Sequence, residues 1–425
     1  MISCSIGSKT FILFYSYNIN RGGKKIKIVA KKTVVFGNRE IGPSFPVFII
    51  AEIGTGHRGD LGRAYALVDK AKEAGADCAK FQWVIADEIV HPQLGTMDLP
   101  GGPTPLYRKF QALEQPAEFY ASCMEYTQKR GLHFLCSVFG QESLRLYQET
   151  VTRDGTGPGI GAGGMGTAGM RTAGMGTAGI KIASPEINHL PLLKSAAETR
   201  MPVMLSTGMS TLGDIENALR YLGNELILLH CVTAYPAPEG ESNLRVIPLL
   251  SAVFDVPAGL SDHSAEPVLA PAAAAALGAR VIEKHICLEK GREGLDDTFA
   301  LPPDEFAVMC RAVRKTESLE KDAALSRLAE EFGEDRVESV LGATLKKVTP
   351  TEEGHYLGTR RSVRALTDLV PGTKLTTENS ALLRSSGRFK PGVGPEFYEV
   401  ILGKIVTKPV KAGDGIGWGD LLSEG

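Results

Sequence analysis

The sequence has little net charge and no long apolar run. Its 425 residues carry a formal net charge of -2, which leaves no electrostatic footprint for nucleic acid or for an anionic membrane surface. The apolar run near the N-terminus, residues 11–15, is too short for a signal peptide or a membrane span. Apolar residues make up 43% and charged residues 23%, as in an ordinary soluble protein. We therefore expect neither a nucleic-acid nor a membrane partner, whereas a small phosphorylated substrate needs only a few local cations.

Two familiar cysteine and histidine patterns are also missing. None of the seven cysteines forms a C-x-x-C pair, so a zinc ribbon or a redox motif is not expected. There is no H-E-x-x-H motif, which disfavours a zinc peptidase. An odd number of cysteines scattered through apolar stretches indicates reduced, buried thiols, and hence a cytoplasmic protein.

Short apolar runs alternate with amphipathic helical stretches from residue 47 onward. Eight such strand–helix units in about 250 residues are typical of a (β/α)8 TIM barrel, an α/β fold. The rival is a doubly wound open sheet, which a Gly-rich loop after the first strand would favour. The segment 53–57 has two of the required glycines but lacks the third. The eight predicted strands are Val47–Ile53, Cys78–Gln82, His133–Ser137, Ile180–Ala183, Val203–Ser206, Ile227–Cys231, Ala258–Ser261 and Val281–His285.

Segments of other character flank this pattern. Residues 1–44 read as an N-terminal extension, in which Gly37-Asn38 predicts a β-hairpin turn. The predicted barrel domain spans 45–315. Charged helical sequence at 316–357 predicts a linker, and short strands broken by Gly and Pro at 358–425 predict a small β-rich domain.

A glycine- and methionine-rich insertion at 155–179 interrupts the barrel pattern with a five-residue repeat that begins at Thr167, Thr172 and Thr177. Such a tract buries too little apolar surface to offset the entropy of ordering it. It lies between the third helix and the fourth strand, so we expect it on the face away from a TIM-barrel active site.

Polar side chains collect where the predicted strands end, the place at which TIM barrels carry their chemistry. Strand ends that only packed a core would be mostly Val, Ile and Leu. We call these residues the strand-end set: Glu52, Lys80, Gln82, Ser137, Lys181, Ser184, Glu186, Ser206, Thr233, Tyr235, Ser261, Asp262, His263, Glu283 and His285.

Two histidines of this set suggest a metal. His263 and His285 close the seventh and eighth strands, which are neighbours in a closed barrel. Two neutral imidazoles, with water and substrate completing the shell, suit a divalent ion such as Mn²⁺ or Mg²⁺. The alternative is that both histidines are structural.

Two lysines of the set suggest an anionic ligand. Lys80 and Lys181 follow apolar runs, where an unpaired ammonium group is costly to bury. A ligand with a phosphate and a carboxylate would compensate them, with serine hydroxyls completing a phosphate cradle. Two alternatives are pairing with an acid such as Glu52, and Schiff-base chemistry at one lysine. The histidines argue against the Schiff base, because a metal and an iminium usually solve the same problem in different ways.

With these motifs in order, the sequence resembles the N-acetylneuraminate (sialic acid) synthase family. Its C-terminal region, from Arg361 to Gly417, resembles the antifreeze-like lid (SAF) domain of that family. The resemblance covers about 33–425 without the insertion. The matching stretches are Ile50–Gly54, Ala79–Gln82, Lys181–Glu186, Leu205–Met209, His230–Pro236, Gly259–His263, Glu283–His285 and Gly294–Asp296.

The resemblance implies a reaction in which C3 of phosphoenolpyruvate attacks the aldehyde of open-chain N-acetylmannosamine, water adds at C2 and phosphate leaves. It implies His263 and His285 as metal ligands, and a domain-swapped homodimer in which the lid of one subunit covers the partner's barrel. Catalytic roles fall to Glu52, Glu186 and the two histidines. Phosphoenolpyruvate would be held by Lys80, Gln82, Ser137, Lys181, Ser184 and Ser206, and the sugar by Glu186, Thr233, Tyr235, Ser261, Asp296 and Lys390.

This sequence departs from the family pattern at three places. Ser137 stands where the family often has Thr, and Thr233 replaces a frequent Asn near the sugar. Lys390 stands where the lid often supplies an arginine before Pro-Gly, so either Lys390, Arg388 or Arg384 serves instead or the contact is absent.

Three alternatives stay open. A diamino sugar as substrate would give legionaminic or pseudaminic acid, or a surface-polysaccharide precursor. The more distant phosphoenolpyruvate–sugar-phosphate synthases lack the SAF-like tail. A non-catalytic barrel scaffold is disfavoured by the intact lysines and histidines.

Overall fold

The structure is a computed structural model, and it describes residues 18–21, 24–27, 33–99, 102–153, 177–223, 225–291, 296–387 and 389–421. Residues 155–176 of the predicted insertion lie outside the described residues. So do Cys4 and Arg388.

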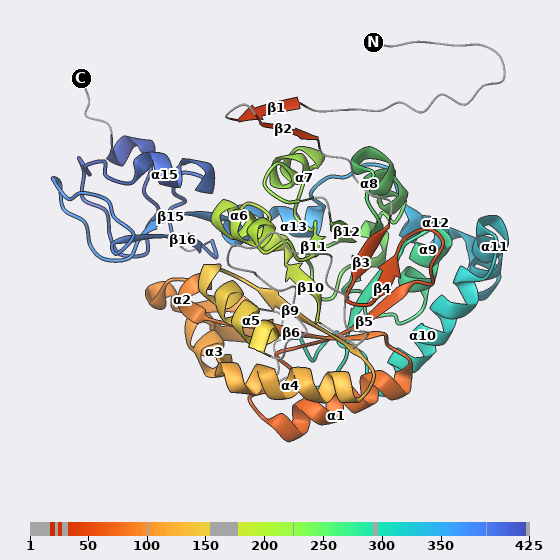
Figure 1. The fold of residues 1–425 in the computed structure, drawn as a ribbon. Helices are drawn as coiled ribbons and strands as arrows, with labels where there is room; N and C mark the ends of the chain where they lie inside the picture. Colours follow the sequence, from red (N-terminus) through yellow and green to blue (C-terminus); the bar gives the residue numbers. More distant parts are fainter. Residues whose placement is uncertain are drawn as a thin grey trace, which may run out of the picture.

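Eight parallel strands close into a barrel, each neighbour hydrogen-bonded to the next (Figure 1). The ring closes where the last strand pairs with the first, with His285 opposite Glu52. All eight predicted strands are therefore confirmed, and the open-sheet alternative is wrong. The strands are β5 (Phe48–Gly54), β6 (Cys78–Trp83), β9 (His133–Val138), β10 (Thr177–Ile182), β11 (Val203–Ser206), β12 (Leu226–Cys231), β13 (Ala258–Asp262) and β14 (Val281–His285).

Helices surround the barrel and bury one face against it. In α1 (Leu61–Ala74), Asp60 caps the start by accepting a hydrogen bond from the Arg63 N–H, and Gly75 ends the helix at φ +96°. Its buried residues recur at helical spacing and pack on the strands. The other surrounding helices are α4 (Ala117–Lys129), α5 (Gln141–Arg153), α6 (Leu190–Glu198), α7 (Leu212–Leu219), α8 (Val246–Phe254), α9 (Leu269–Ala276) and α10 (Pro303–Glu317).

Smaller elements lie between β6 and α4 and at the N-terminus. The segment after β6 forms α2 (Ala86–Ile89), a hairpin of β7 (Thr96–Leu99) and β8 (Gly102–Pro105), and α3 (Leu106–Leu113). Ahead of the barrel, β1 (Asn18–Arg21) pairs with β2 (Lys24–Lys27).

The predicted N-terminal hairpin closes one end of the barrel. β3 (Val34–Phe36) pairs antiparallel with β4 (Arg39–Ile41) around Gly37-Asn38, and Gly37 takes φ +65°, which favours glycine. Phe36 is fully buried in a cluster with Phe48 and Val281, the first residues of β5 and β14. The hairpin therefore fills the amino-terminal end, and the strand-end set lies at the other.

The chain after the barrel forms a helical linker and a small domain. α11 (Lys321–Phe332) and α12 (Glu334–Leu341) pack on α9, and α13 (Pro350–Glu353) and α14 (Tyr356–Thr359) lead onward. β15 (Arg361–Ala365) pairs antiparallel with β16 (Ser380–Arg384), and α15 (Tyr398–Ile401) follows. This C-terminal domain has its own apolar cluster, which includes Val363, Val406 and Ile416.

Two further findings bear on the sequence expectations. The six described cysteines are all free and buried. Within the described part of the chain, no helix combines the length and the apolar character that crossing a membrane requires.

The hairpin's contribution to stability can be tested at Phe36. We expect Phe36→Ala to lower the free energy of unfolding by about 3–5 kcal/mol, because it leaves a cavity at the closed barrel end. Urea unfolding followed by circular dichroism measures the change. Val253→Ala, at a 53% exposed position of α8, is the control and should change it by less than about 1 kcal/mol. Equal effects of the two substitutions would show that the hairpin does not hold the barrel together.

Candidate active site

A buried network of two lysines and two carboxylates forms the floor of the site. Lys80 of β6 places its Nζ 2.9 Å from Glu52 Oε2 and 2.9 Å from Glu283 Oε2. Glu52 belongs to β5 and Glu283 to β14, and these two strands are paired in the barrel. It also donates to Ser137 Oγ at 3.3 Å. The alternative in which Lys80 pairs with Glu52 is therefore confirmed, and Glu283 joins the pair.

Lys181 of β10 lies near the other carboxylate oxygen of Glu283. Its Nζ donates to Ser206 Oγ at 2.7 Å and lies 3.8 Å from Glu283 Oε1, which accepts a hydrogen bond from Ser261 Oγ at 2.8 Å. Burial lowers the pKa of Lys181 to about 8, although Glu283 opposes this shift. The two ammonium groups thus share Glu283. Burial alone would raise the pKa of Glu283, but the two lysines lower it to about 2.

Glu52 is placed to exchange a proton near neutral pH. Burial raises its pKa to about 7 against the attraction of Lys80. Gln82 Nε2 donates to Glu52 Oε1 at 2.9 Å and holds the carboxyl group in place. A carboxyl group with a pKa close to the working pH is suited to general acid–base chemistry.

The two histidines lie side by side above this floor. The ring centroids of His263 and His285 are 5.6 Å apart. His263 Nδ1 lies 2.9 Å from the Val232 carbonyl, which only accepts, so Nδ1 carries a proton and Nε2 keeps its lone pair when the ring is neutral. Burial and the neighbouring His263 lower the pKa of His285 well below its ordinary value, so His285 stays neutral.

The donor set fits a two-histidine metal site with open positions. Among the described residues, no group of three His, Cys, Asp or Glu side chains is arranged to hold a metal ion, so water and substrate atoms would complete the shell. Burial opposes a charge on His263, but the negative charge of the Cys231 thiolate and the Val232 carbonyl raise its pKa to about 9. Metal binding at His263 would therefore release a proton.

The open side of the site carries Tyr235 and Asp296. The Tyr235 ring lies 4.5 Å from the His263 ring and 5.0 Å from Phe299, between centroids. Asp296 Oδ2 lies 3.7 Å from His285 Nδ1. Gly54, at φ +56°, marks how closely these groups converge: a Cβ there would lie 3.2 Å from both Asp296 Oδ2 and Glu52 Oε1.

Glu186 has partners that the sequence did not predict. It is fully buried and forms ion pairs with Arg361 and Arg384, from the two strands of the C-terminal domain. Burial alone would raise its pKa, but the two guanidinium groups hold it at about 2. Arg361 also donates to the Phe139 carbonyl at 2.7 Å. No pattern in the sequence predicted that either arginine contacts Glu186. Arg384 was only one of three cations of the C-terminal domain considered for the sugar site.

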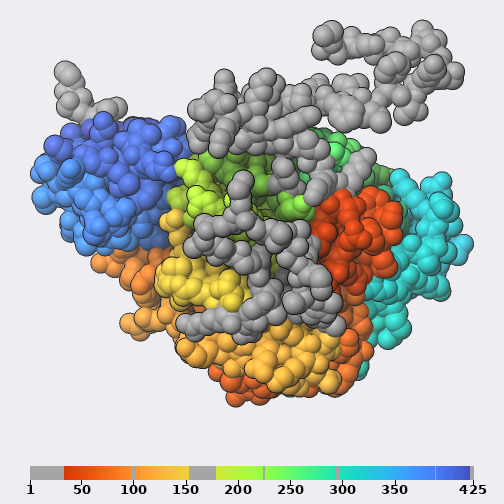
Figure 2. Space-filling model, viewed as in Figure 1, coloured from red at the N-terminus to blue at the C-terminus, as the bar shows by residue number. Residues whose placement is uncertain are grey.

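The same contacts seat the C-terminal domain against its own barrel. Figure 2 shows this domain, in blue, against the barrel side that contains α2 and α5, and Val90 forms a bridge with Arg384 there. Lys390, predicted on the sugar side, is largely exposed and its Nζ lies 3.5 Å from Asp420 of the same domain. Within one chain, Arg384 rather than Lys390 reaches a residue of the strand-end set.

The remaining predicted residues also lie at this end of the barrel. Ser184 Oγ accepts a hydrogen bond from the Gly208 N–H at 2.9 Å, and Thr233 is buried two residues after β12. Asp262 points elsewhere, because it pairs with Lys284 at 2.5 Å together with Ser264. That pair is a buried structural contact outside the network around Glu283.

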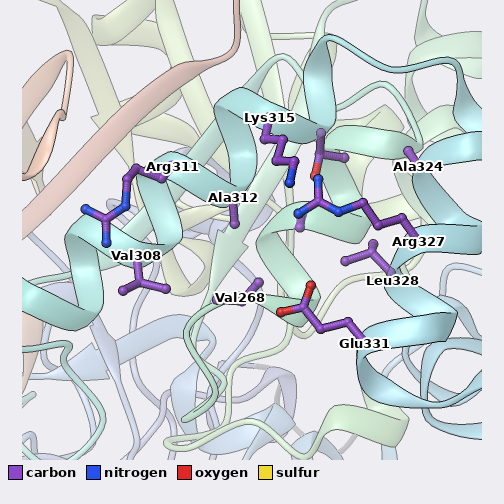
Figure 3. A pocket seen from close by; sticks show the side chains of 11 residues that line it. Val268, Val308, Arg311, Ala312, Lys315, Ala324, Arg327, Leu328 and Glu331 are labelled. Atoms are coloured by element: carbon purple, nitrogen blue, oxygen red, sulfur yellow. The ribbon is translucent and has the colours of Figure 1, made fainter.

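A separate surface hollow of 210 Å³ lies between α9, α10 and α11 (Figure 3). Its lining includes Val268, Ala312, Lys315, Arg327 and Glu331, and shares no residue with the strand-end set. It therefore takes no part in the site described above.

Comparison with known proteins identifies the class of this fold and site. The NeuB family model matches residues 67–153 and 170–324, and the SAF domain model matches 360–422. The chain therefore belongs to the NeuB family, whose members are sialic and related nonulosonic acid synthases. It is a phosphoenolpyruvate-dependent, carbon–carbon bond-forming synthase of that type, so the non-catalytic scaffold alternative is wrong.

Three relatives illustrate the range of the family. The spore coat polysaccharide biosynthesis protein SpsE of Bacillus subtilis is 34% identical over 392 residues, 91% of this chain and 96% of the relative. Its crystal structure matches with a TM-score of 0.74 and covers 92% of this chain and 100% of that one. The N,N'-diacetyllegionaminic acid synthase of Legionella pneumophila is 30% identical, over 90% of this chain and 96% of its own. The human N-acetylneuraminate-9-phosphate synthase is 31% identical, over 89% and 93%.

The buried ion pairs of Glu186 generate a stability prediction. Glu186→Gln should lower the free energy of unfolding by about 3 kcal/mol, because it leaves the buried guanidinium of Arg361 and the partly buried one of Arg384 without a compensating charge. Urea unfolding of the two proteins measures the difference. Glu216→Gln, which breaks an exposed pair with Arg220, is the matched control and should cost less than about 1 kcal/mol. A loss as small as the control's would mean that these ion pairs do not fix the C-terminal domain.

Proposed function

We propose that the chain condenses phosphoenolpyruvate with an open-chain N-acylated amino sugar of the N-acetylmannosamine type, giving a nonulosonic acid and phosphate. The observation that carries this proposal is the convergence of Lys80 and Lys181 on Glu283, next to paired histidines at one barrel end. The family's chemistry needs cations for a phosphate and a carboxylate, and an electrophile for an aldehyde. The two lysines and the two histidines lie together at this end of the barrel.

The lysine side is suited to phosphoenolpyruvate. Lys80 and Lys181 are almost completely buried, so an anion that reaches them leaves most of its water behind and interacts strongly. Ser137 and Ser206 already contact the two ammonium groups and would turn with them toward phosphate or carboxylate oxygens. We place Gln82, Ser184 and the two lysines in the same role, as the family resemblance implies.

The histidine side is suited to the sugar aldehyde. A divalent ion held by His263 and His285, manganese or magnesium, would polarise the aldehyde oxygen. Glu52 holds a proton at a pKa of about 7 and would deliver it or take it up as the bond to C3 forms and water adds at C2. The aldehyde oxygen takes up a proton and becomes a hydroxyl group. At C2 the added hydroxyl then loses its proton to form the ketone, while the carbon–oxygen bond to phosphate breaks and phosphate takes the electron pair.

The identity of the sugar rests on Tyr235, Ser261, Thr233 and Asp296. The three relatives named above are 30–34% identical to this chain, and two of them are named for different products. Overall similarity therefore does not select the sugar. A diamino sugar, giving legionaminic or pseudaminic acid or a polysaccharide precursor, is the second candidate.

We also propose a homodimer in which C-terminal domains are exchanged. The contact between Glu186 and the arginines at 361 and 384 buries charges on both domains, so the same contact would form between chains if the linker carried the domain across.

A phosphate-release screen tests the proposed reaction. The enzyme, with phosphoenolpyruvate and a divalent ion, should release phosphate only when N-acetylmannosamine, its 6-phosphate or a diamino analogue is added. Excess chelator should stop the release, and added Mn²⁺ should restore it. Release that persists in chelator would overturn the metal assignment, and release without any sugar would overturn the condensation.

The pKa of Lys181 predicts the alkaline limb of the pH profile. Its ammonium form binds phosphoenolpyruvate, so kcat/KM for phosphoenolpyruvate should fall as pH rises through about 8, by about tenfold per pH unit. Lys181→Arg stays charged throughout this range, so whatever activity it keeps should show no such limb. An unchanged limb in that variant would assign the titration to another group.

A further inference from the structure

The loop after β11 contains a residue held in a strained conformation. Met209 has φ +48°, a region that residues with a Cβ enter at a cost and keep only when their surroundings hold them there. The loop begins at Ser206, whose hydroxyl oxygen accepts a hydrogen bond from the Lys181 ammonium group. Its conformation therefore bears directly on the phosphoenolpyruvate side of the site.

A carboxylate from outside the barrel holds this loop. Glu352 lies in α13 and is completely buried. Its Oε1 accepts hydrogen bonds from the backbone N–H of Met209 and of Thr233, both at 2.7 Å. Its Oε2 accepts from the Thr349 N–H at 3.0 Å, which fixes the side chain within its own helix turn. One carboxylate thus ties the loop after β11 to the loop after β12.

The residues that follow Glu352 hold Met209 at further points. Arg360 donates from Nη2 to the Met209 carbonyl at 3.1 Å and to Asp214 of α7 at 2.9 Å. Thr359 Oγ1 lies 3.1 Å from Met209 Sδ. Residues between 352 and 360 therefore contact the backbone N–H, the carbonyl and the side chain of Met209.

The two tied loops leave little room to shift. A Cβ on Gly208 would collide with Thr233 Oγ1 and lie 3.0 Å from Ser184 Oγ. Gly208 donates its N–H to that same serine hydroxyl. A movement of Met209 would therefore displace Gly208 against Ser184 on one side and Thr233 on the other.

We propose that Glu352 is a positioning residue, which fixes the Ser206–Met209 loop and Thr233 so that the phosphoenolpyruvate and sugar sides keep their mutual geometry. The proposal rests on the proposed function for the identity of the two substrates. Glu352 touches neither substrate, and it acts through the two backbone N–H groups.

The test compares Glu352→Ala, Glu352→Gln and the control Glu353→Gln, whose side chain is exposed in the same turn. Phosphoenolpyruvate affinity is measured by calorimetry without sugar, and KM and kcat by phosphate release. All measurements are made well below each variant's melting temperature. Glu352→Ala should weaken phosphoenolpyruvate binding by about tenfold or more, equal to about 1.4 kcal/mol, and should raise the KM for sugar. Glu353→Gln should match the wild type.

Glu352→Gln gives a second test, because a purely structural role does not predict that a folded variant loses phosphoenolpyruvate affinity. The amide keeps the size of the side chain but has one acceptor oxygen for three N–H donors, so its –NH₂ group must face a donor. We expect it to fold and to show an intermediate loss of affinity. Should Glu352→Ala fail to fold, Glu352→Gln carries the test.

Two outcomes separate the proposals. If folded Glu352 variants keep phosphoenolpyruvate affinity and both KM values within twofold of the wild type, the positioning role is wrong. If the wild type binds phosphoenolpyruvate but no sugar gives phosphate, the proposed condensation fails, and the calorimetric comparison still decides the role of Glu352.

Discussion

The shared carboxylate of Glu283 is the interaction on which the site depends. Two buried ammonium groups near each other repel and would each lose hydration on burial. Glu283, between Lys80 and Lys181, and Glu52 beside Lys80 supply the compensating charge. The four side chains come from β5, β6, β10 and β14, so the network forms only when the barrel closes. Closure of the fold and assembly of the anion site are therefore one event.

The division of the barrel into two ends follows from the same geometry. In a parallel barrel all strands point the same way, so apolar residues at the starts and polar residues at the ends separate into two layers. Phe36, Phe48 and Val281 fill the first layer with an apolar cluster. The charged layer lies next to this apolar layer, and its side chains are almost completely buried. This arrangement explains why the pKa of Glu52 rises to about 7 while Lys80 stays charged.

Much of this was predictable from the sequence because it depends on local patterns. Apolar runs at regular spacing predicted eight strands, a Gly-Asn pair predicted the hairpin, and a common strand direction brought Lys80, His263 and His285 to one end. The contacts of Glu186 with Arg361 and Arg384, and of Glu352 with Met209 and Thr233, were not predictable. They join residues 119–198 positions apart, and no local periodicity relates a linker or a small β-rich domain to a particular strand end. Glu283 was recognised as a strand-end residue, but its sharing between two lysines depends on which side chains meet across the barrel interior, since β14 is not a neighbour of β6 or β10.

These long-range contacts change how the boundaries of the catalytic unit should be drawn. By sequence the barrel ends near residue 315, and the rest reads as a linker and a lid. In the structure, however, arginines of the C-terminal domain pair with a buried carboxylate of the barrel. A linker carboxylate and the Arg360 that follows it hold the strained Met209 of a barrel loop. A barrel cut at residue 315 would keep Lys80, Lys181 and the histidines but would expose Glu186 and release Met209. The charges that we propose to bind substrate lie on the barrel strands, whereas contacts that hold the neighbouring loop and Glu186 come from the chain after residue 315.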